Sequence, residues 1–393
     1  MRSSAPSISP TVAQIPVHGT RAIAAIAAGR ADVINLTLGE PDFDTPRHIA
    51  EAGIAAVRAG HTRYAPGAGL PQLREAAAAA VTVRCGGIVS AEQVVVTAGA
   101  VLGVFAALAA LVPRGGRVLV PDPGWGCYVG QCVALGLEPV RYPLRPETGF
   151  EPDLETLDAL AAESGASLMV INNPGNPTGA VWRRDAVEGC VELGRRHGLW
   201  VLADEVYDEL TFDRDHVSTV PFGEGGVVTT FSFSKTYAMT GWRVGYLVGS
   251  PSVAAAATRV LEHVASSVGM PSQYAAFAAL QGPQNCVAEM RSAYRARRDL
   301  AIGRLAEAGL PSSKPDGAFY VLADVSAAGS GSAAFARELA SQPSGVACAP
   351  GETFGPGAAG MLRLSLAAPP EAIEEGIRRI GKAVQDRRER FGR

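Results

Sequence analysis

The segment Thr229–Gly245 contains side chains that together could bind a phosphate group and react with a carbonyl compound. Its sequence is TTFSFSKTYAMTGWRVG, in which an apolar stretch ends in Ser232 and Ser234 and is followed by Lys235 and Arg243. Serine hydroxyls and the guanidinium group of arginine bind phosphate. A lysine at the end of a buried strand is placed to form a Schiff base, and an ordinary surface lysine is the alternative interpretation.

Lysine is rare in this chain, which makes its positions informative. Only three of the 35 basic residues are lysines, namely Lys235, Lys314 and Lys382. This bias is mainly a matter of overall composition. A guanidinium group cannot be deprotonated into a nucleophile, so a chain that favours arginine keeps lysine where an amine is required.

A second segment, VLADEVYDEL at residues 201–210, places an aspartate after three apolar residues. Asp204 should therefore lie at the buried carboxyl end of a strand, where open α/β sheets bind ligands. A buried aspartate needs a charged or hydrogen-bonding partner, and a protonated pyridine nitrogen would be one. Taken alone, without the other motifs, Asp204 would more readily be read as the N-cap of a helix. We expect Glu205 and Asp208 to be exposed acids of a helix.

A third segment, Asn172–Gly179, reads NNPGNPTG and predicts a rigid loop at a strand end. Its two Asn-Pro steps restrict the backbone and present amide side chains, although an ordinary turn would also explain them. The histidines share no spacing. We expect His61, His197 and His216 to be solvated rather than catalytic.

The elements that must position these segments alternate between strand and helix. Apolar, β-branched runs predict strands at residues 94–97, 117–121, 168–171, 199–203, 227–231 and 242–248. Ala-rich stretches between them predict helices, among them 100–111 and 183–197. Such alternation predicts a mostly parallel sheet covered on both faces.

The pattern changes towards the carboxyl terminus, becoming helical after residue 251 and mixed after residue 315. We therefore divide the chain into three parts. Residues 1–45 form an N-terminal arm that contributes to a small domain, residues 46–285 a large α/β domain, and residues 286–393 the rest of the small α+β domain.

Composition excludes several classes of protein. The 393 residues are 47% hydrophobic and 19% charged with a net charge of −3, which argues against disorder and against a nucleic-acid binder. Six cysteines are too few for a disulfide scaffold, and no metal-ligand spacing is present. The longest nearly apolar run, Ala98–Val112, has 15 residues, fewer than the ~20 that a membrane span needs. We expect a cytoplasmic protein without a membrane, nucleic-acid or metal partner.

Taken together, the motifs resemble those of the fold-type-I pyridoxal-phosphate enzymes, specifically the aspartate aminotransferase-like (class I/II) family. Five separated segments match in order, from GEPDFDTP at Gly39 to RLSL at Arg363. The resemblance implies a large domain with a mostly parallel seven-stranded sheet between helices. It also implies a smaller α+β domain built from the N-terminal arm and the C-terminal part.

The resemblance assigns roles around the ring of pyridoxal 5′-phosphate. Lys235 matches the lysine that carries this cofactor as an internal aldimine, and Asp204 matches the aspartate that pairs with the pyridine nitrogen. Tyr207 and Asn176 match the groups that hydrogen-bond the ring hydroxyl. Trp125, in PDPGW, matches the aromatic residue that stacks on the ring. Lys235, Asp204 and Tyr207 are thus the expected catalytic residues.

Other matches concern the cofactor phosphate. Ser232, Ser234 and Arg243 stand where the family contacts phosphate. The backbone N–H groups of Ala100 and Val101 would reach it from the N-terminus of a helix.

The remaining matches concern the substrate and a second subunit. Gly39 and Arg363 match the groups that hold the substrate carboxylate, and Trp125 and Asn176 border the same place. Tyr64 resembles the tyrosine that crosses from the partner subunit to the phosphate. The resemblance therefore implies a homodimer with shared active sites, and a cis Asn176–Pro177 bond.

The expected activity is transfer of an amino group between an L-amino acid and a 2-oxo acid by a ping-pong mechanism. A lyase, a β/γ-replacement enzyme or a cyclising enzyme on the same scaffold is the alternative, because the same electron sink can expel a substituent. Relatives specific for dicarboxylates carry a lysine where this chain has Val101. We therefore expect aspartate and glutamate not to be the preferred donors, unless an arginine approaches from elsewhere.

Overall fold

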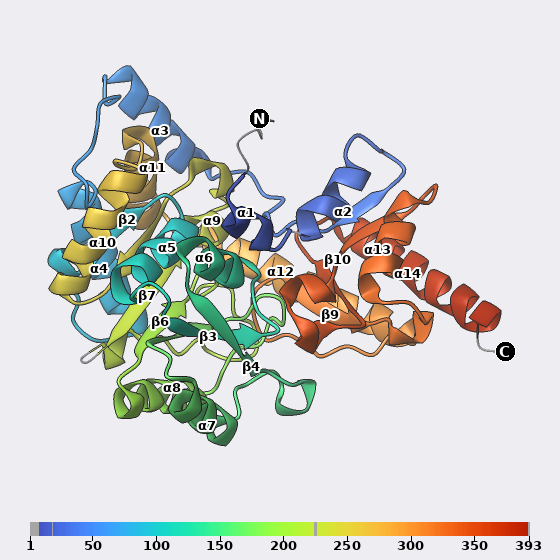
Figure 1. The fold of residues 1–393 in the computed structure, drawn as a ribbon. Coiled ribbons are helices and arrows are strands. Elements are labelled where there is room, and N and C mark those ends of the chain that lie inside the picture. Colours follow the sequence, from blue (N-terminus) through green and yellow to red (C-terminus); the bar gives the residue numbers. More distant parts are fainter. Residues whose placement is uncertain (1–7, 18, 224–225, 392–393) are drawn as a thin grey trace, which may run out of the picture.

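A seven-stranded sheet forms the centre of the larger part of the molecule in the computed structural model, which describes residues 8–17, 19–223 and 226–391 (Figure 1). Its strands are β2 (Val94–Thr97), β3 (Arg117–Asp122), β4 (Glu138–Pro143), β5 (Leu168–Asn172), β6 (Trp200–Asp204), β7 (Val227–Ser232) and β8 (Gly245–Val248). The strand order is β2-β8-β7-β6-β5-β3-β4, and only β8 runs antiparallel to its neighbours. This is the mostly parallel sheet that the alternating pattern predicted.

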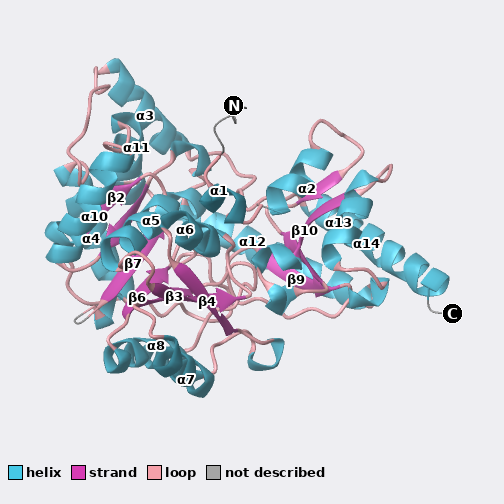
Figure 2. Cartoon of the chain, in the orientation of Figure 1, coloured by secondary structure: helices cyan, strands magenta, loops and turns pink. Residues whose placement is uncertain are grey.

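Helices cover both faces of this sheet because successive strand residues point to opposite sides. Val118 and Val120 pack with α5 (Ala100–Leu111), α6 (Cys127–Leu135) and α10 (Pro251–Val264). Leu119, between them, packs on the other side with α7 (Leu154–Ser164) and α8 (Arg184–His197). The two groups of helices are seen on opposite sides of the strands in Figure 2.

A four-stranded sheet forms the centre of the smaller part, with the order β1-β10-β11-β9. Its strands are β1 (Ile34–Leu36), β9 (Tyr320–Asp324), β10 (Val346–Pro350) and β11 (Met361–Ser365). The N-terminal β1 pairs in parallel with β10, so the two ends of the chain share one sheet. The two-part α/β fold class is confirmed, and the domain boundaries after residues 45 and 285 stay predictions.

The remaining helices lie around these two sheets. They are α1 (Pro10–Gln14), α2 (Gly19–Ala27), α3 (Arg47–Arg58), α4 (Pro71–Cys85), α9 (Phe233–Thr236), α11 (Met270–Gln281), α12 (Asn285–Glu307), α13 (Ser332–Ser341) and α14 (Pro370–Phe391). Helix α2 lies beside α13 and β10 (Figure 1). No helix within the described ranges is long and apolar enough to cross a membrane.

Two differences from the sequence prediction have local causes. Strand β4 was not predicted, because it is an edge strand in which half-exposed and exposed residues dilute the apolar pattern. Strand β8 begins at Gly245 rather than at residue 242. The preceding residues Thr240–Trp242 form a 3₁₀ turn, and Arg243 has a φ of 51°.

The parallel arrangement gathers the chemically interesting segments at one edge of the large sheet. Strands β3, β5, β6 and β7 run in the same direction, so their carboxyl ends lie side by side. These ends are Asp122, Asn172, Asp204 and Ser232. Open α/β sheets bind their ligands at this edge.

Candidate active site

A cavity of about 500 Å³ lies at the carboxyl edge of the large sheet and also reaches the small one. It brings together all but one of the residues expected at the site. Those that line it are Gly39, Ala100, Val101, Trp125, Asn176, Asp204, Tyr207, Ser232, Ser234, Lys235, Arg243 and Arg363. Tyr64 does not line the cavity of this single chain, and 87% of its surface is exposed.

Lys235 enters the cavity from α9, the single turn that follows β7. Ser232 begins this turn, where its Oγ accepts a hydrogen bond of 3.1 Å from the backbone N–H of Ser234. The Nζ of Lys235 donates a hydrogen bond of 2.6 Å to the carbonyl oxygen of Gly39. Burial lowers the pKa of Lys235 to about 8 because it disfavours the charged form. The neutral, nucleophilic amine is therefore readily formed.

Asp204 is the last residue of β6 and is 2% exposed. The Tyr128 hydroxyl donates a hydrogen bond of 2.6 Å to its Oδ2. Its Oδ1 is buried without a hydrogen-bond partner among the residues that the structure describes. Burial raises the pKa of Asp204 to about 6, although the hydrogen bond from Tyr128 opposes this shift. A cationic N–H donor in the cavity would satisfy Oδ1 and keep the carboxylate ionised.

An anion-binding corner lies where α5 begins. Gly99 has a φ of 74°, and a side-chain Cβ there would lie 2.6 Å from Nη2 of Arg243. The absence of a side chain thus lets the guanidinium group approach the first turn of α5, whose N-terminal N–H groups also attract anions. Arg243 is exposed and donates a hydrogen bond of 2.9 Å to the carbonyl oxygen of Thr240. This corner fits a phosphate group.

Arg363 is a buried cation on β11, with 3% of its surface exposed. It donates hydrogen bonds to Oδ1 of Asn176, at 3.0 Å, and to the carbonyl oxygen of Thr37. Within the described part of the chain, the partners of Arg363 include no acidic side chain, and its Nε has no hydrogen-bond partner. A buried arginine without an anion is costly, so the site fits a ligand carboxylate.

The Asn-Pro loop is held against the aspartate strand by its first residue. Asn172 donates a hydrogen bond of 2.9 Å to the carbonyl oxygen of Asp204 and accepts one of 2.8 Å from the N–H of Asn176. The Asn176–Pro177 bond is cis, as expected. The loop therefore presents Asn176 to both Arg363 and the cavity.

Sequence reasoning missed several residues that line the cavity, among them Arg21, Tyr128 and Tyr320. Tyr128 lies in the first turn of α6, and its ring meets that of Trp125 edge to face with centroids 5.5 Å apart. Its only signal in the sequence was its place three residues after Trp125. Arg21 comes from α2 and is exposed. Arg21 thus reaches the cavity from a segment far from Val101, as the expectation about the amino donor had allowed for an arginine to do. Tyr320 carried no signal beyond its place in an apolar strand.

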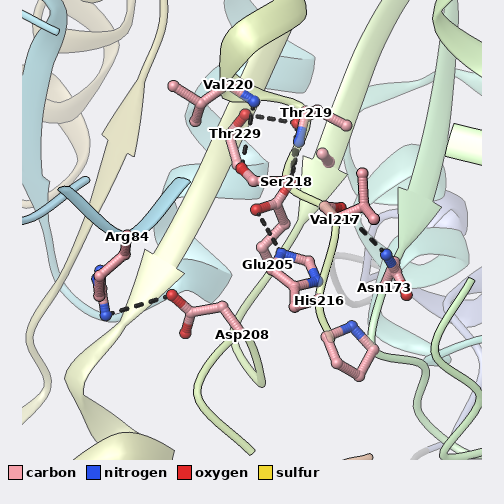
Figure 3. A network of polar contacts seen from close by, with 12 residues as sticks. Arg84, Asn173, Glu205, Asp208, His216, Val217, Ser218, Thr219, Val220 and Thr229 are labelled. Carbon is pink, nitrogen blue, oxygen red and sulfur yellow. Dashed lines mark hydrogen bonds and ion pairs between the residues drawn. The ribbon is translucent and has the colours of Figure 1, made fainter. Parts of the chain in front are cut away.

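The expectations for Glu205, Asp208 and His216 were wrong. Glu205 is 1% exposed and accepts hydrogen bonds from His216 Nε2, at 2.9 Å, and from the Thr219 N–H, at 2.7 Å (Figure 3). The largely buried Asp208 side chain lies 3.3 Å from Arg84. The chain after Asp204 forms a turn and not a surface helix, so these acids point inwards.

The charges of this network support one another. Burial by itself would raise the pKa of Glu205, but the neighbouring His216 and the hydrogen bonds to Glu205 bring it below its usual range. Burial likewise opposes charge on His216, yet Glu205 raises its pKa. His61 and His197 are partly exposed and do not line the cavity.

Comparisons with known proteins bear on this site. The sequence profile of the family described as aminotransferase class I and II matches residues 31–380. The chain belongs to this family. An arginine–pyruvate transaminase of Pseudomonas aeruginosa is 40% identical over 367 residues, covering 92% of this chain and 92% of that protein. A probable aspartate/prephenate aminotransferase of Aquifex aeolicus is 38% identical over 370 residues, covering 92% and 93%.

The fold agrees with this assignment. The solved structure of Thermus thermophilus aspartate aminotransferase with maleate matches with a TM-score of 0.91 at 34% identity, covering 96% of this chain and 100% of that one. The resemblance to the fold-type-I pyridoxal-phosphate aminotransferases is thus confirmed, and this protein is an aminotransferase. The similar proteins do not favour the lyase alternative.

The cavity of this aminotransferase fits the cofactor of its family. Pyridoxal phosphate carries a carbonyl group, a ring nitrogen that can be protonated, and a phosphate. The half-buried amine of Lys235 suits the carbonyl group, and the unpartnered Oδ1 of Asp204 suits the ring nitrogen. The corner between Arg243 and the start of α5 suits the phosphate.

Proposed function

We propose that this aminotransferase binds pyridoxal 5′-phosphate through Lys235 and moves an amino group from an L-amino acid to a 2-oxo acid in two half-reactions. The observation that carries the proposal is the pairing of two groups in one cavity. These are the amine of Lys235, with its lowered pKa, and the buried, unpartnered Oδ1 of Asp204. When bound, the cofactor supplies a carbonyl group and a ring that withdraws electrons from the substrate Cα.

Asp204 holds a proton on the ring nitrogen through its free Oδ1. Tyr128 donates to the other oxygen and so favours the ionised carboxylate that this role requires. Tyr207 and Asn176 hydrogen-bond the ring hydroxyl, and Trp125 stacks on the ring. Together these residues would hold the ring of the cofactor in the cavity.

Lys235 moves a proton to and from the substrate Cα. An amine whose pKa lies near 8 is close to the working pH, which suits a general base. The carbonyl oxygen of Gly39 accepts a hydrogen bond from Nζ and directs the amine. Arg363 binds the substrate carboxylate, helped by Gly39 and Asn176, and so aligns the Cα–H bond with the ring.

The phosphate is held by Ser232, Ser234, Arg243 and the N–H groups of Ala100 and Val101. Tyr64 completes this site from a partner subunit, so we propose a homodimer with shared active sites. The exposure of Tyr64 supports this, and so do the exposed apolar side chains of Ile54 and Val57 on α3. We also propose that the dimer is cytoplasmic, on the basis of the composition, the few cysteines and the short apolar runs of the sequence.

A single-turnover experiment tests the proposal. The holoenzyme is mixed with a panel of amino acids in the absence of any oxo-acid acceptor. We expect one equivalent of oxo acid per site, no free ammonia, and steady turnover only after an acceptor is added. Continuous release of ammonia or of a displaced group without an acceptor would instead identify a lyase.

A further inference from the structure

Tyr320 lies between the small sheet, to which it belongs, and the active-site cavity at the edge of the large sheet. It is the first residue of β9, is 2% exposed, and lines the active-site cavity from the small sheet. It contacts residues from three other segments, each belonging to a different part of the proposed site.

The hydroxyl of Tyr320 lies 2.9 Å from the hydroxyl of Tyr207. The two rings meet edge to face, with centroids 5.8 Å apart, and both side chains are buried. A phenol has one proton to donate. If Tyr207 donates to the ring hydroxyl of the cofactor, its oxygen must accept from Tyr320. The second phenol therefore sets the direction in which the first one donates.

The ring of Tyr320 faces the guanidinium group of Arg363. The distance from the guanidinium carbon to the ring centroid is 4.2 Å, and the ring of Phe354 lies 4.8 Å from the same carbon. A buried guanidinium group is attracted to the face of an aromatic ring. Since Arg363 lacks an acidic partner within the described residues, these rings and its hydrogen bonds to Asn176 and Thr37 hold its position.

The hydroxyl of Tyr320 also packs against Gly39. A side-chain Cβ at Gly39 would clash with this hydroxyl, so only glycine lets the two segments approach. The carbonyl oxygen of Gly39 is the acceptor for Lys235. Tyr320 therefore contacts Gly39, which accepts the hydrogen bond from Lys235, in addition to Tyr207 and Arg363.

We propose that Tyr320 is a positioning residue with two separable actions. Its hydroxyl donates to the oxygen of Tyr207 and so directs the Tyr207 proton towards the cofactor. Its ring holds the Arg363 guanidinium group in the orientation that receives the substrate carboxylate. This inference rests on the proposed roles of Tyr207 and Arg363.

The two actions can be separated by two substitutions at one position. Tyr320→Phe removes the hydroxyl and keeps the ring, whereas Tyr320→Leu removes both. Tyr294→Phe is a matched control, because Tyr294 is also buried, does not line the cavity, and its hydroxyl has no partner among the described residues. All variants are studied as holoenzymes, together with Tyr207→Phe and the double variant Tyr207→Phe/Tyr320→Phe.

The hydroxyl action is read from the pH titration of the visible absorbance band. We expect Tyr320→Phe to shift the apparent pKa of the band in the same direction as Tyr207→Phe. The double variant should behave like Tyr207→Phe alone, because the two hydroxyls act in series. A Tyr320→Phe titration identical to the wild type overturns this action, as does a double variant whose shift is the sum of the single shifts. An equal shift in Tyr294→Phe also overturns it.

The ring action is read from steady-state kinetics. We expect Tyr320→Phe to keep the KM for the amino donor, and Tyr320→Leu to raise it about tenfold. An unchanged KM in Tyr320→Leu, or an equal rise in Tyr320→Phe, overturns this action. If the wild-type enzyme transaminates and this activity depends on Lys235, the proposed function holds whether or not the roles of Tyr320 are overturned.

Discussion

Tyr128 donates a hydrogen bond of 2.6 Å to Oδ2 of Asp204, and both side chains are almost completely buried. The bond favours the ionised carboxylate, whereas the burial of the pair favours the protonated one. Because Tyr128 occupies only Oδ2, Oδ1 is left for a donor inside the cavity. The relationship explains how a strand residue deep in the sheet can remain available to a ligand.

Replacing Lys235 with alanine should abolish turnover and covalent attachment of the cofactor, since only an amine can react with the carbonyl group. Borohydride treatment of the holoenzyme followed by peptide mapping checks this. Lys314→Ala is the control, because Lys314 is exposed and forms an ion pair of 2.8 Å with Asp213. A label on Lys314 or Lys382 in the wild type would show that the attachment site is elsewhere.

Replacing Asp204 with asparagine should leave the cofactor bound and slow exchange of the substrate Cα–H by about 10³-fold or more. An amide cannot stabilise the positive charge on the ring nitrogen, so the Cα carbanion loses its electron sink. The exchange is followed by NMR in deuterated water. Exchange at the wild-type rate would show that another group protonates the ring.

The same substitution should stabilise the apoenzyme. Burial raises the pKa of Asp204 from 3.8 to about 6. Between these values the folded apoenzyme binds more protons than the unfolded chain, so its stability falls as pH rises through this window. Above about pH 6, ionised Asp204 costs roughly 1–3 kcal/mol, which Asp204→Asn removes.

Urea unfolding of the two apoenzymes measures this difference. The free energy of unfolding of Asp204→Asn should exceed that of the wild type at about pH 7.5, and the gap should shrink towards about pH 4.5, where the wild-type carboxyl is protonated. A gap that does not change with pH would show that the burial of Asp204 is not the cause.

Mixing a Tyr64→Phe subunit with a Lys235→Ala subunit should restore part of the activity. If Tyr64 serves the site of the partner, the mixed dimer carries both lesions in one site and leaves the other intact. Activity is measured after subunit exchange and compared with each parent. Full activity of a verified monomer, or no gain on mixing, would contradict shared sites.

Aspartate should not exceed alanine, phenylalanine and methionine in kcat/KM by about tenfold, which would correspond to ~1.4 kcal/mol. Val101 offers no charge at the start of α5, and Arg21 is exposed. Exposed ion pairs contribute about 0–1 kcal/mol. Arg21→Gln should therefore change the ratio of aspartate to alanine by less than tenfold. A larger aspartate preference that disappears in this variant would assign a dicarboxylate specificity to Arg21.

The sequence by itself determined the central parallel strands of the large sheet and the polar residues at or just after their ends. Buried parallel strands are continuous apolar runs in the sequence. For this reason β3, β5, β6 and β7 can be predicted without knowledge of the fold. The polar residues that follow them, such as Asp204 and Lys235, then fall at one edge by the geometry of a parallel sheet. The edge strand β4 was not predicted, because its residues are partly exposed and do not form a continuous apolar run.

Only the tertiary structure decided which distant residues meet and where polar side chains point. Thr37 and Arg363 meet because β1 joins the C-terminal strands in one sheet, and Asn176 reaches Arg363 from the loop after β5 of the other sheet. No local pattern encodes either contact. The burial of Glu205 and the place of Tyr320 depend on the same kind of contact. The spacing of apolar residues predicts which side of a single helix or strand is buried. Which group a polar side chain contacts depends on how several helices and strands pack together.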